Sequence, residues 1–504
     1  MDNILEYIYK RYNQFGDFCN AITVPNQHIM IQVFREAKHC SVDFEQRIID
    51  EEIKRMQKSV GQFQELPADR ECVQPKSIFL RIFILNIVAS SIPEVFYRDI
   101  MYSAASIVEI SLAIVLYYLG LQTYMYSGED ITETEKKNLI GRTDFYFTLH
   151  ELQKVRGKTT GEELNKYLEL FAKDIADISE EKQIGLFLDE GIPFIICIEE
   201  FLDYMIFYLE EYFRKNASEP EYSQYTDAKG KAFEEMVYGI TKGLVQESYH
   251  TLYYHPNERQ KMEVDVVYRD KGNIAILECK SGTFNIAGLD RDELIKLQIH
   301  NKTKKAYKTL SAVTQYLEQT EEYNFECENQ KIVGYTDNPV CIHVSMYPMD
   351  FFASNVHVLF PEYLEETSPI LSLSIEHLVA MMLDAKTKDE DIFEYWKKRK
   401  KDIQDYSGVY FDNNELDLYY EIVNEDKNTM LAELKRQGII DRLNSNVRIF
   451  SSFHNEYGEE VRPAKEMLKT VDMYLLMNIF DSGKSWFGIN KRYLKNLEEY
   501  LRIF

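Results

Sequence analysis

The sequence predicts an α+β protein in which a central module containing a sheet lies between helical regions. Apolar residues recur at helical spacing before residue 220, and short β-like runs cluster at 247–281. Helical periodicity returns from about residue 373. At roughly 100–200 residues per domain, 504 residues allow two to four domains. We divide the chain into an all-helical domain (1–220), a central domain (226–360) and a mainly helical C-terminal region (361–504).

The overall charge is strongly acidic. Lys and Arg total 58 against 83 Asp and Glu, which gives a net charge of −25. This excludes a protein coated in basic surface, such as a histone-like protein or a polybasic membrane binder. A nucleic-acid enzyme remains open, because its affinity depends on the local groove and on bound metal rather than on net charge.

The cysteines and the N-terminal residues indicate the cellular compartment of the protein. The seven cysteines form no CxxC pair, so we expect neither a disulfide framework nor a structural zinc site. A reducing compartment, the cytoplasm, is the simple interpretation. The opening residues MDNILEYIYKRY lack a basic segment followed by an apolar core, so we expect no secretory signal.

One apolar stretch tests for a membrane span. Residues 104–120, AASIVEISLAIVLYYLG, contain a single charge, Glu109. The run is at the lower limit of length for a transmembrane helix, and an internal charge disfavours one further. We therefore expect a buried core helix and no membrane contact.

The central module has its own order of elements. A polar, aperiodic stretch at 214–230 marks its boundary. Phe233, Val237 and Ile240 then lie on one helical face. The expected strands are 247–254, 263–269 and 274–281, followed by a helix after 290 and β-like runs at 339–346 and 355–360. Asp270–Asn273 has the composition of a hairpin turn, so the order is α-β-β-β-α-β with one further run.

This order brings ionisable residues together. Strand alternation places Asp265 on one face of its strand, and Glu278 and Lys280 on one face of the next, with Cys279 pointing the other way. Pairing across the turn brings Asp265 beside Glu278. Burying such groups is costly unless they are paired or hold a metal, and carboxylate oxygens suit Mg²⁺. The alternative is an ordinary surface ion pair between Glu278 and Lys280.

Asp265 followed by Glu278-Cys279-Lys280 across a hairpin resembles the PD-(D/E)xK nuclease superfamily. Upstream, Gly230-Lys231-Ala232-Phe233-Glu234 resembles the G-x-x-F-E helix start of many such domains. The resemblance covers about 226–360 and departs from the family at Val264, where a proline often stands. It implies a restriction-endonuclease-like αβββαβ core.

The resemblance also implies roles. Asp265, Glu278 and the backbone carbonyl of Cys279 would bind Mg²⁺ or Mn²⁺, and Glu234 rather than Glu235 would complete the acidic cluster. Lys280 would orient or help deprotonate the attacking water. The expected reaction is hydrolysis of phosphodiester bonds, leaving a 5′-phosphate and a 3′-hydroxyl, with DNA favoured over RNA.

Two basic segments are further candidates for nucleic-acid contacts. A helix after 290 is basic in an acidic chain, and its candidate residues are Lys302, Lys304, Lys305, Lys308 and Gln315. A solvated helix face explains these residues equally well. For the run Trp396–Lys401 we favour a solvated face over a base-stacking site. Residues 430–450 have the texture of a winged-helix recognition helix and wing.

The function we expect is a metal-dependent nuclease, by analogy an effector of a restriction or anti-phage defence system. A regulatory protein or an oligomeric partner would bind its helical regions. Two alternatives stay open: a non-catalytic scaffold with a nuclease-like core, and an RNA-cleaving toxin built on the same module.

Overall fold

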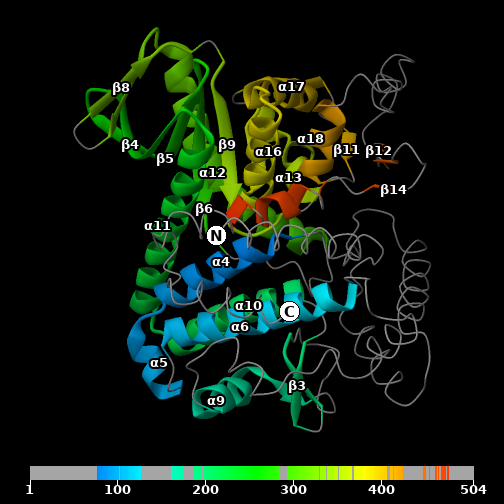
Figure 1. The fold of residues 1–504 in the computed structure, drawn as a ribbon. Coiled ribbons are helices and arrows are strands. Elements are labelled where there is room, and N and C mark those ends of the chain that lie inside the picture. Colours follow the sequence, from blue (N-terminus) through cyan, green and yellow to red (C-terminus); the bar gives the residue numbers. More distant parts are fainter. Residues whose placement is uncertain are drawn as a thin grey trace. The chain divides into compact units, whose positions relative to one another are not determined.

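The computed structural model describes the chain in segments. They are residues 76–100, 103–126, 161–174, 185–189, 191–195, 198–282, 292–327, 330–336, 338–349, 351–365, 368–405, 409–411, 414–423, 447–449, 453–454, 460–461, 464, 467–472 and 474–475. The chain forms two compact units. One comprises Met1–Tyr225 with Asp472–Phe504, and the other comprises Thr226–Val471. The structure is mixed α/β, as the sequence predicts (Figure 1).

Helices dominate the described part of the first unit. They are α4 (Ile78–Ser91), α5 (Glu94–Ile100), α6 (Ala104–Tyr126), α9 (Gly161–Phe171) and α10 (Ile198–Asn216). A small sheet of β1 (Lys173–Asp174), β2 (Phe187–Asp189) and β3 (Ile192–Phe194) accompanies them, so the prediction of an all-helical region was wrong here. Strands this short carry too little periodicity to be recognised in a sequence.

The apolar stretch at 104–120 lies in α6. The side chains of Ile107, Ile110 and Ile114 are almost completely buried. Among the described helices, none has the length and apolar character that crossing a bilayer requires.

The predicted irregular boundary at 214–230 is mostly helical. Helix α11 (Glu219–Leu244) begins within it, directly after Ser218. Both the backbone N–H and the hydroxyl of Ser218 donate to Glu221 Oε2, at 2.8 and 2.5 Å. This Ser-x-x-Glu pair is a helix-start signal, and it outweighs the polar composition that suggested a linker.

The second unit is built on a seven-stranded mixed sheet of order β10-β9-β6-β5-β4-β7-β8. Its strands are β4 (Glu247–Asn257), β5 (Gln260–Asp270), β6 (Asn273–Lys280), β7 (Tyr323–Cys327), β8 (Gln330–Gly334), β9 (Val340–Ser345) and β10 (Leu371–Ser374). The predicted hairpin is confirmed, because β5 and β6 pair antiparallel and are joined through Lys271 and Gly272, both at positive φ. Strand β9 pairs parallel with β6, and β10 parallel with β9.

Helix α12 (Asp292–Gln319) follows β6 and packs on β6 and β9. Thr314 contacts Cys341 of β9, and the Tyr307 hydroxyl lies 3.0 Å from Ser372 Oγ of β10. Along the chain, the hairpin β7–β8 follows α12 and precedes β9, and it was not predicted. The expected order α-β-β-β-α-β is therefore interrupted by two additional strands.

Later elements also differ from the prediction. Residues 355–360, expected as a strand, contain helix α14 (Val356–Leu359), between α13 (Phe351–Ser354) and α15 (Glu362–Glu365). A short apolar run does not distinguish the two types by periodicity. Helices α16 (Ile375–Thr387), α17 (Ile392–Asp405) and α18 (Glu415–Val423) then group beside β9 (Figure 1).

The winged-helix prediction at 430–450 lies outside the described residues except for β12 (Val447–Ile449), which pairs parallel with β11 (Val409–Phe411). The described chain also contains a small hairpin of β13 (Phe453–His454) and β14 (Glu460–Val461).

The basic run on α17 is only partly solvated. Trp396 is fully buried and donates from Nε1 to the Tyr268 hydroxyl of β5, at 2.9 Å. Arg399 and Lys400 are also buried, and Lys400 donates to the Pro339 carbonyl at 2.9 Å. The buried positions recur at intervals of three and four, so this face of α17 joins the core. The prediction of a solvated face was wrong at Trp396, Arg399 and Lys400.

Candidate active site

Adjacent strands place the first carboxylate. Val266 of β5 pairs with Leu277 of β6, which brings the preceding Asp265 beside Glu278. The backbone N–H of Cys279 donates to Asp265 Oδ2 at 2.6 Å. This hydrogen bond fixes the Asp265 carboxylate against β6 and leaves its Oδ1 atom without a hydrogen-bond partner among the described residues.

The second carboxylate is paired with the lysine two residues on. Lys280 Nζ donates to Glu278 Oε1 at 2.5 Å and to the Cys279 carbonyl at 3.2 Å. Glu278 is only 5% exposed, whereas the Lys280 side chain is 23% exposed. The pair is therefore an ion pair at the edge of a buried site, which differs from an exposed surface bridge.

Helix α11 contributes a third carboxylate. Phe233 is fully buried and anchors the helix, and the next residue, Glu234, is half-buried. Burial, and next the negative charge of Asp265, raise the pKa of Glu234 to about 7. Glu235 is exposed. Of these two neighbouring glutamates, the one that shares the electrostatic field of the site is Glu234.

The cluster holds more negative charge than its lysine balances. Burial and the neighbouring Asp265 raise the pKa of Glu278 to about 7. Burial likewise raises the pKa of Asp265, although Lys280 and the Cys279 N–H oppose that rise. Burial alone would lower the pKa of Lys280, but Glu278 and Asp265 outweigh it and raise the pKa. Lys280 is therefore an ammonium at neutral pH, and a bound cation would relieve the remaining repulsion.

The donor set fits a hard divalent cation. Among the described residues, no group of three or more His, Cys, Asp and Glu side chains has the arrangement of a metal site. The site therefore offers two carboxylate side chains, those of Asp265 and Glu278, and adds the backbone carbonyl of Cys279. Mg²⁺ commonly takes one or two carboxylates and fills its other positions with water and phosphate oxygens. The Cys279 thiol is buried and its pKa is raised well above its ordinary value, so the thiol itself is not a ligand.

Stabilisation by metal should increase with pH. Glu278 and Glu234 have folded-state pKa values of about 7, above their unfolded values. Their contribution to metal-free stability is therefore present below about pH 4.5 and is lost as the pH rises through 7. A cation binds the deprotonated carboxylates, so Mn²⁺ should raise Tm more at pH 8 than at pH 6. Differential scanning fluorimetry would measure this shift. An equal shift at both pH values, or an unchanged pH dependence in Glu278→Gln, would contradict the site.

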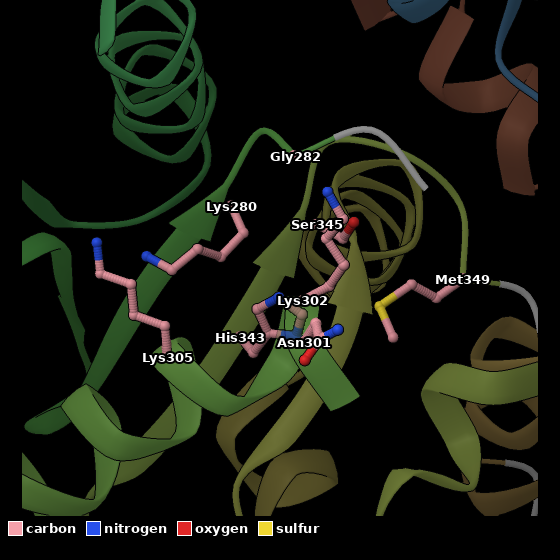
Figure 2. A pocket seen from close by; sticks show the side chains of 8 residues that line it. All are labelled: Lys280, Gly282, Asn301, Lys302, Lys305, His343, Ser345 and Met349. Atoms are coloured by element: carbon pink, nitrogen blue, oxygen red, sulfur yellow. The ribbon is translucent and has the colours of Figure 1, made fainter. Parts of the chain in front are cut away.

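The basic helix contributes selectively. Lys302 and Lys305 of α12 line a cavity together with Lys280 of β6 (Figure 2). Lys304, Lys308 and Gln315 are exposed and do not line this cavity. The structure thus brings two of the five candidate residues of α12 to the site.

Three further residues lie near the site and were not predicted from the sequence. His343 and Ser345 of β9 line the same cavity, opposite Glu278 and Lys280 in register. Thr251 of β4 lies between positions paired with Val264 and Val266, and so stands opposite Asp265 in sequence register; its φ of 54° is unusual for a β-branched residue. In the sequence, His343 and Ser345 are marked only by being polar residues that alternate with apolar ones along β9.

His343 is held neutral. Burial first, and then the positive charge of Lys280, lower the pKa of His343 to about 3. Its Nδ1 lies 3.2 Å from Ser372 Oγ, and its buried Nε2 finds no hydrogen-bond partner in the described part of the chain.

No family model, no curated protein and no solved structure matches the chain. The assignment of a function therefore rests on the geometry of the site.

Proposed function

We propose that the protein is a metal-dependent nuclease of the PD-(D/E)xK kind. The observation that carries this proposal is the meeting of Asp265 of β5 with Glu278 and Lys280 of the paired strand β6, in a cluster with excess negative charge. The order α11-β4-β5-β6-α12-β9 supports the proposed restriction-endonuclease-like core, into which β7 and β8 are inserted.

Each side chain has a proposed role. Asp265, Glu278 and the Cys279 carbonyl hold Mg²⁺ or Mn²⁺, which supplies Lewis-acid polarisation of the phosphate and a bound water of lowered pKa. Lys280, as an ammonium, orients the attacking water and offsets the charge that develops on the pentavalent phosphate. Glu234 has a pKa of about 7, which suits exchange of a proton with water near neutral pH.

The cationic cavity supports a phosphate-bearing substrate. Lys280, Lys302 and Lys305 form a local reversal of charge in a chain of net charge −25. We favour DNA over RNA, and an effector role in restriction or anti-phage defence, by analogy with the superfamily. A regulatory or oligomeric partner would restrain the activity through the helical regions. Among the described residues, Cys279, Cys327 and Cys341 form no disulfide. We favour a reducing compartment, the cytoplasm, from the sparse cysteines of the sequence.

Cleavage assays test the proposal. Single-stranded DNA, double-stranded DNA and RNA would be offered side by side with Mg²⁺ or Mn²⁺ to the wild type and to Lys280→Met. We expect metal-dependent cutting of DNA that falls by about 10²-fold or more in the variant. Preferential cutting of RNA would support the toxin alternative. Metal binding by neither protein, together with no cutting, would support a scaffold.

A further inference from the structure

The cavity beside the carboxylates is a distinct compartment. It has a volume of about 150 Å³ and is lined by Lys280, Gly282, Asn301, Lys302, Lys305, His343, Ser345 and Met349. Asp265, Glu278 and Glu234 are not among these residues. Figure 2 shows side chains from β6, α12 and β9 arranged around a common space. The lining contributes the ammonium groups of Lys302, Lys305 and Lys280 and no carboxylate, so it favours an anion, although Lys280 is also paired with Glu278.

One wall of the cavity offers a buried neutral hydrogen-bonding group. The Tyr307 hydroxyl donates to the Ile370 carbonyl at 3.2 Å, so the Ser372 hydroxyl donates either to Tyr307 or to His343 Nδ1. When Ser372 donates to Nδ1, the proton of the neutral imidazole lies on Nε2. His343 is 1% exposed, and its Nε2 atom has no hydrogen-bond partner among the residues that the structure describes. In this tautomer the buried Nε2 atom of His343 is a hydrogen-bond donor.

On another wall a lysine side chain lies against the backbone. A Cβ atom built on Gly282 would lie 2.9 Å from Lys302 Nζ and 3.3 Å from its Cδ. The Lys302 side chain therefore runs closely along the backbone just after β6. The absence of a side chain at Gly282 gives the amine room at the edge of the cavity.

The size of the cavity limits the ligand. At about 30 Å³ per water molecule, 150 Å³ accommodates about five waters. Pockets for molecules of nucleoside size and larger are usually about 300–1,000 Å³. A single tetrahedral oxyanion therefore fits. The ammonium groups of Lys302 and Lys305, beside the Lys280 that is paired with Glu278, suit a phosphate monoester, which carries about −1.5 to −2 at neutral pH, better than the single charge of a diester.

We propose that this cavity binds the terminal phosphate monoester of a nucleic acid strand and so places the strand end against Asp265 and Glu278. The proposal rests on the proposed nuclease function and specifies its substrate as phosphorylated ends. Register supports the placement. Glu278 pairs with His343 and Lys280 pairs with Ser345, so the carboxylate site and the cavity lie on neighbouring strands and share Lys280.

Binding without catalysis tests the proposal. Fluorescence anisotropy in EDTA, at about 150 mM salt, would compare one oligonucleotide carrying a 5′-phosphate, a 3′-phosphate or hydroxyls at both ends. The full chain would be used as wild type, Lys305→Gln and Lys304→Gln. Both lysines are exposed on α12, but only Lys305 lines the cavity. Inorganic phosphate would serve as the competitor.

We expect the wild type to bind one phosphorylated oligonucleotide at least about tenfold more tightly than the hydroxyl form. Lys305→Gln should abolish this preference and Lys304→Gln should keep it, and inorganic phosphate should compete. Equal affinity for all three oligonucleotides would overturn the proposal, as would a preference that survives Lys305→Gln. Inorganic phosphate binding that depends on Lys305 without any end preference would assign the cavity to free phosphate and also overturn it.

The outcomes separate this proposal from the nuclease assignment. Metal-dependent cutting that is equally fast on phosphorylated, hydroxyl-ended and circular substrates would reject the end-binding cavity and keep the nuclease. An end preference without any cutting would keep the cavity and count against the nuclease.

Discussion

Asp265→Asn should abolish metal-dependent cleavage without weakening the fold. The amide oxygen can still accept the hydrogen bond from the Cys279 N–H, so the local geometry should persist. Because burial raises the pKa of Asp265, ionising this carboxylate is unfavourable in the folded state, and the neutral amide removes that cost. We expect a rate loss on the order of 10³-fold with an unchanged or higher metal-free Tm.

The matched comparison for this prediction uses Glu234→Gln and Glu235→Gln. The first removes the carboxylate within the field of Asp265, and the second removes an exposed carboxylate one residue away. Cleavage rates should fall only in Glu234→Gln and stay within about threefold in Glu235→Gln. Full activity in Asp265→Asn, or equal losses in the two glutamine variants, would contradict the assignment.

Arg399→Met should strongly destabilise the protein. The Arg399 side chain is buried and donates to both carboxylate oxygens of Glu415, from Nη2 at 2.7 Å and from Nε at 3.1 Å. It also donates to the Ser354 carbonyl at 3.1 Å. Removing one partner leaves a buried charge uncompensated, which costs about 3–5 kcal/mol. Urea denaturation should show this loss.

Two further variants separate charge pairing from packing. Arg399→Met combined with Glu415→Gln should recover part of the stability, because no unpaired charge remains. Lys397→Met, which breaks an exposed pair with Glu394 on the same helix, should cost less than about 0.5 kcal/mol. A loss in Lys397→Met as large as that in Arg399→Met would refute the distinction between the buried and exposed faces of α17.

Local patterns account for the parts of the fold that the sequence predicted. Alternation over Glu263–Tyr268 and Ile274–Lys280, with a turn between them, was enough to place the β5–β6 hairpin. The same alternation brought Asp265 and Glu278 together, because antiparallel neighbours joined by a tight turn have a fixed register. No long-range information was required for this pair.

Features that depend on distant residues were missed. The cavity needs β9 to pair parallel with β6, more than 60 residues earlier, and nothing in either strand specifies that register. The buried face of α17 depends likewise on Tyr268 and Glu415. From its sequence alone, a charged run that is partly buried cannot be distinguished from one that is fully solvated. Only the residues that the run contacts show that half of it is buried. The start of α11 is a different case. Ser218 and Glu221 form a capping pair that the sequence shows, but the polar composition of 214–230 led to the prediction of an irregular boundary instead.

Cleavage by the wild type beside Glu278→Gln, with Mg²⁺, with Mn²⁺ and with EDTA, tests the central claim most directly. Calorimetric titration of Mn²⁺ into both proteins would accompany it. Metal-dependent cutting and metal binding that are present in the wild type and lost in Glu278→Gln are the predicted results. Cutting that persists in Glu278→Gln or in EDTA, or Mn²⁺ affinity equal in the two proteins, would contradict a metal-dependent nuclease centred on Asp265 and Glu278.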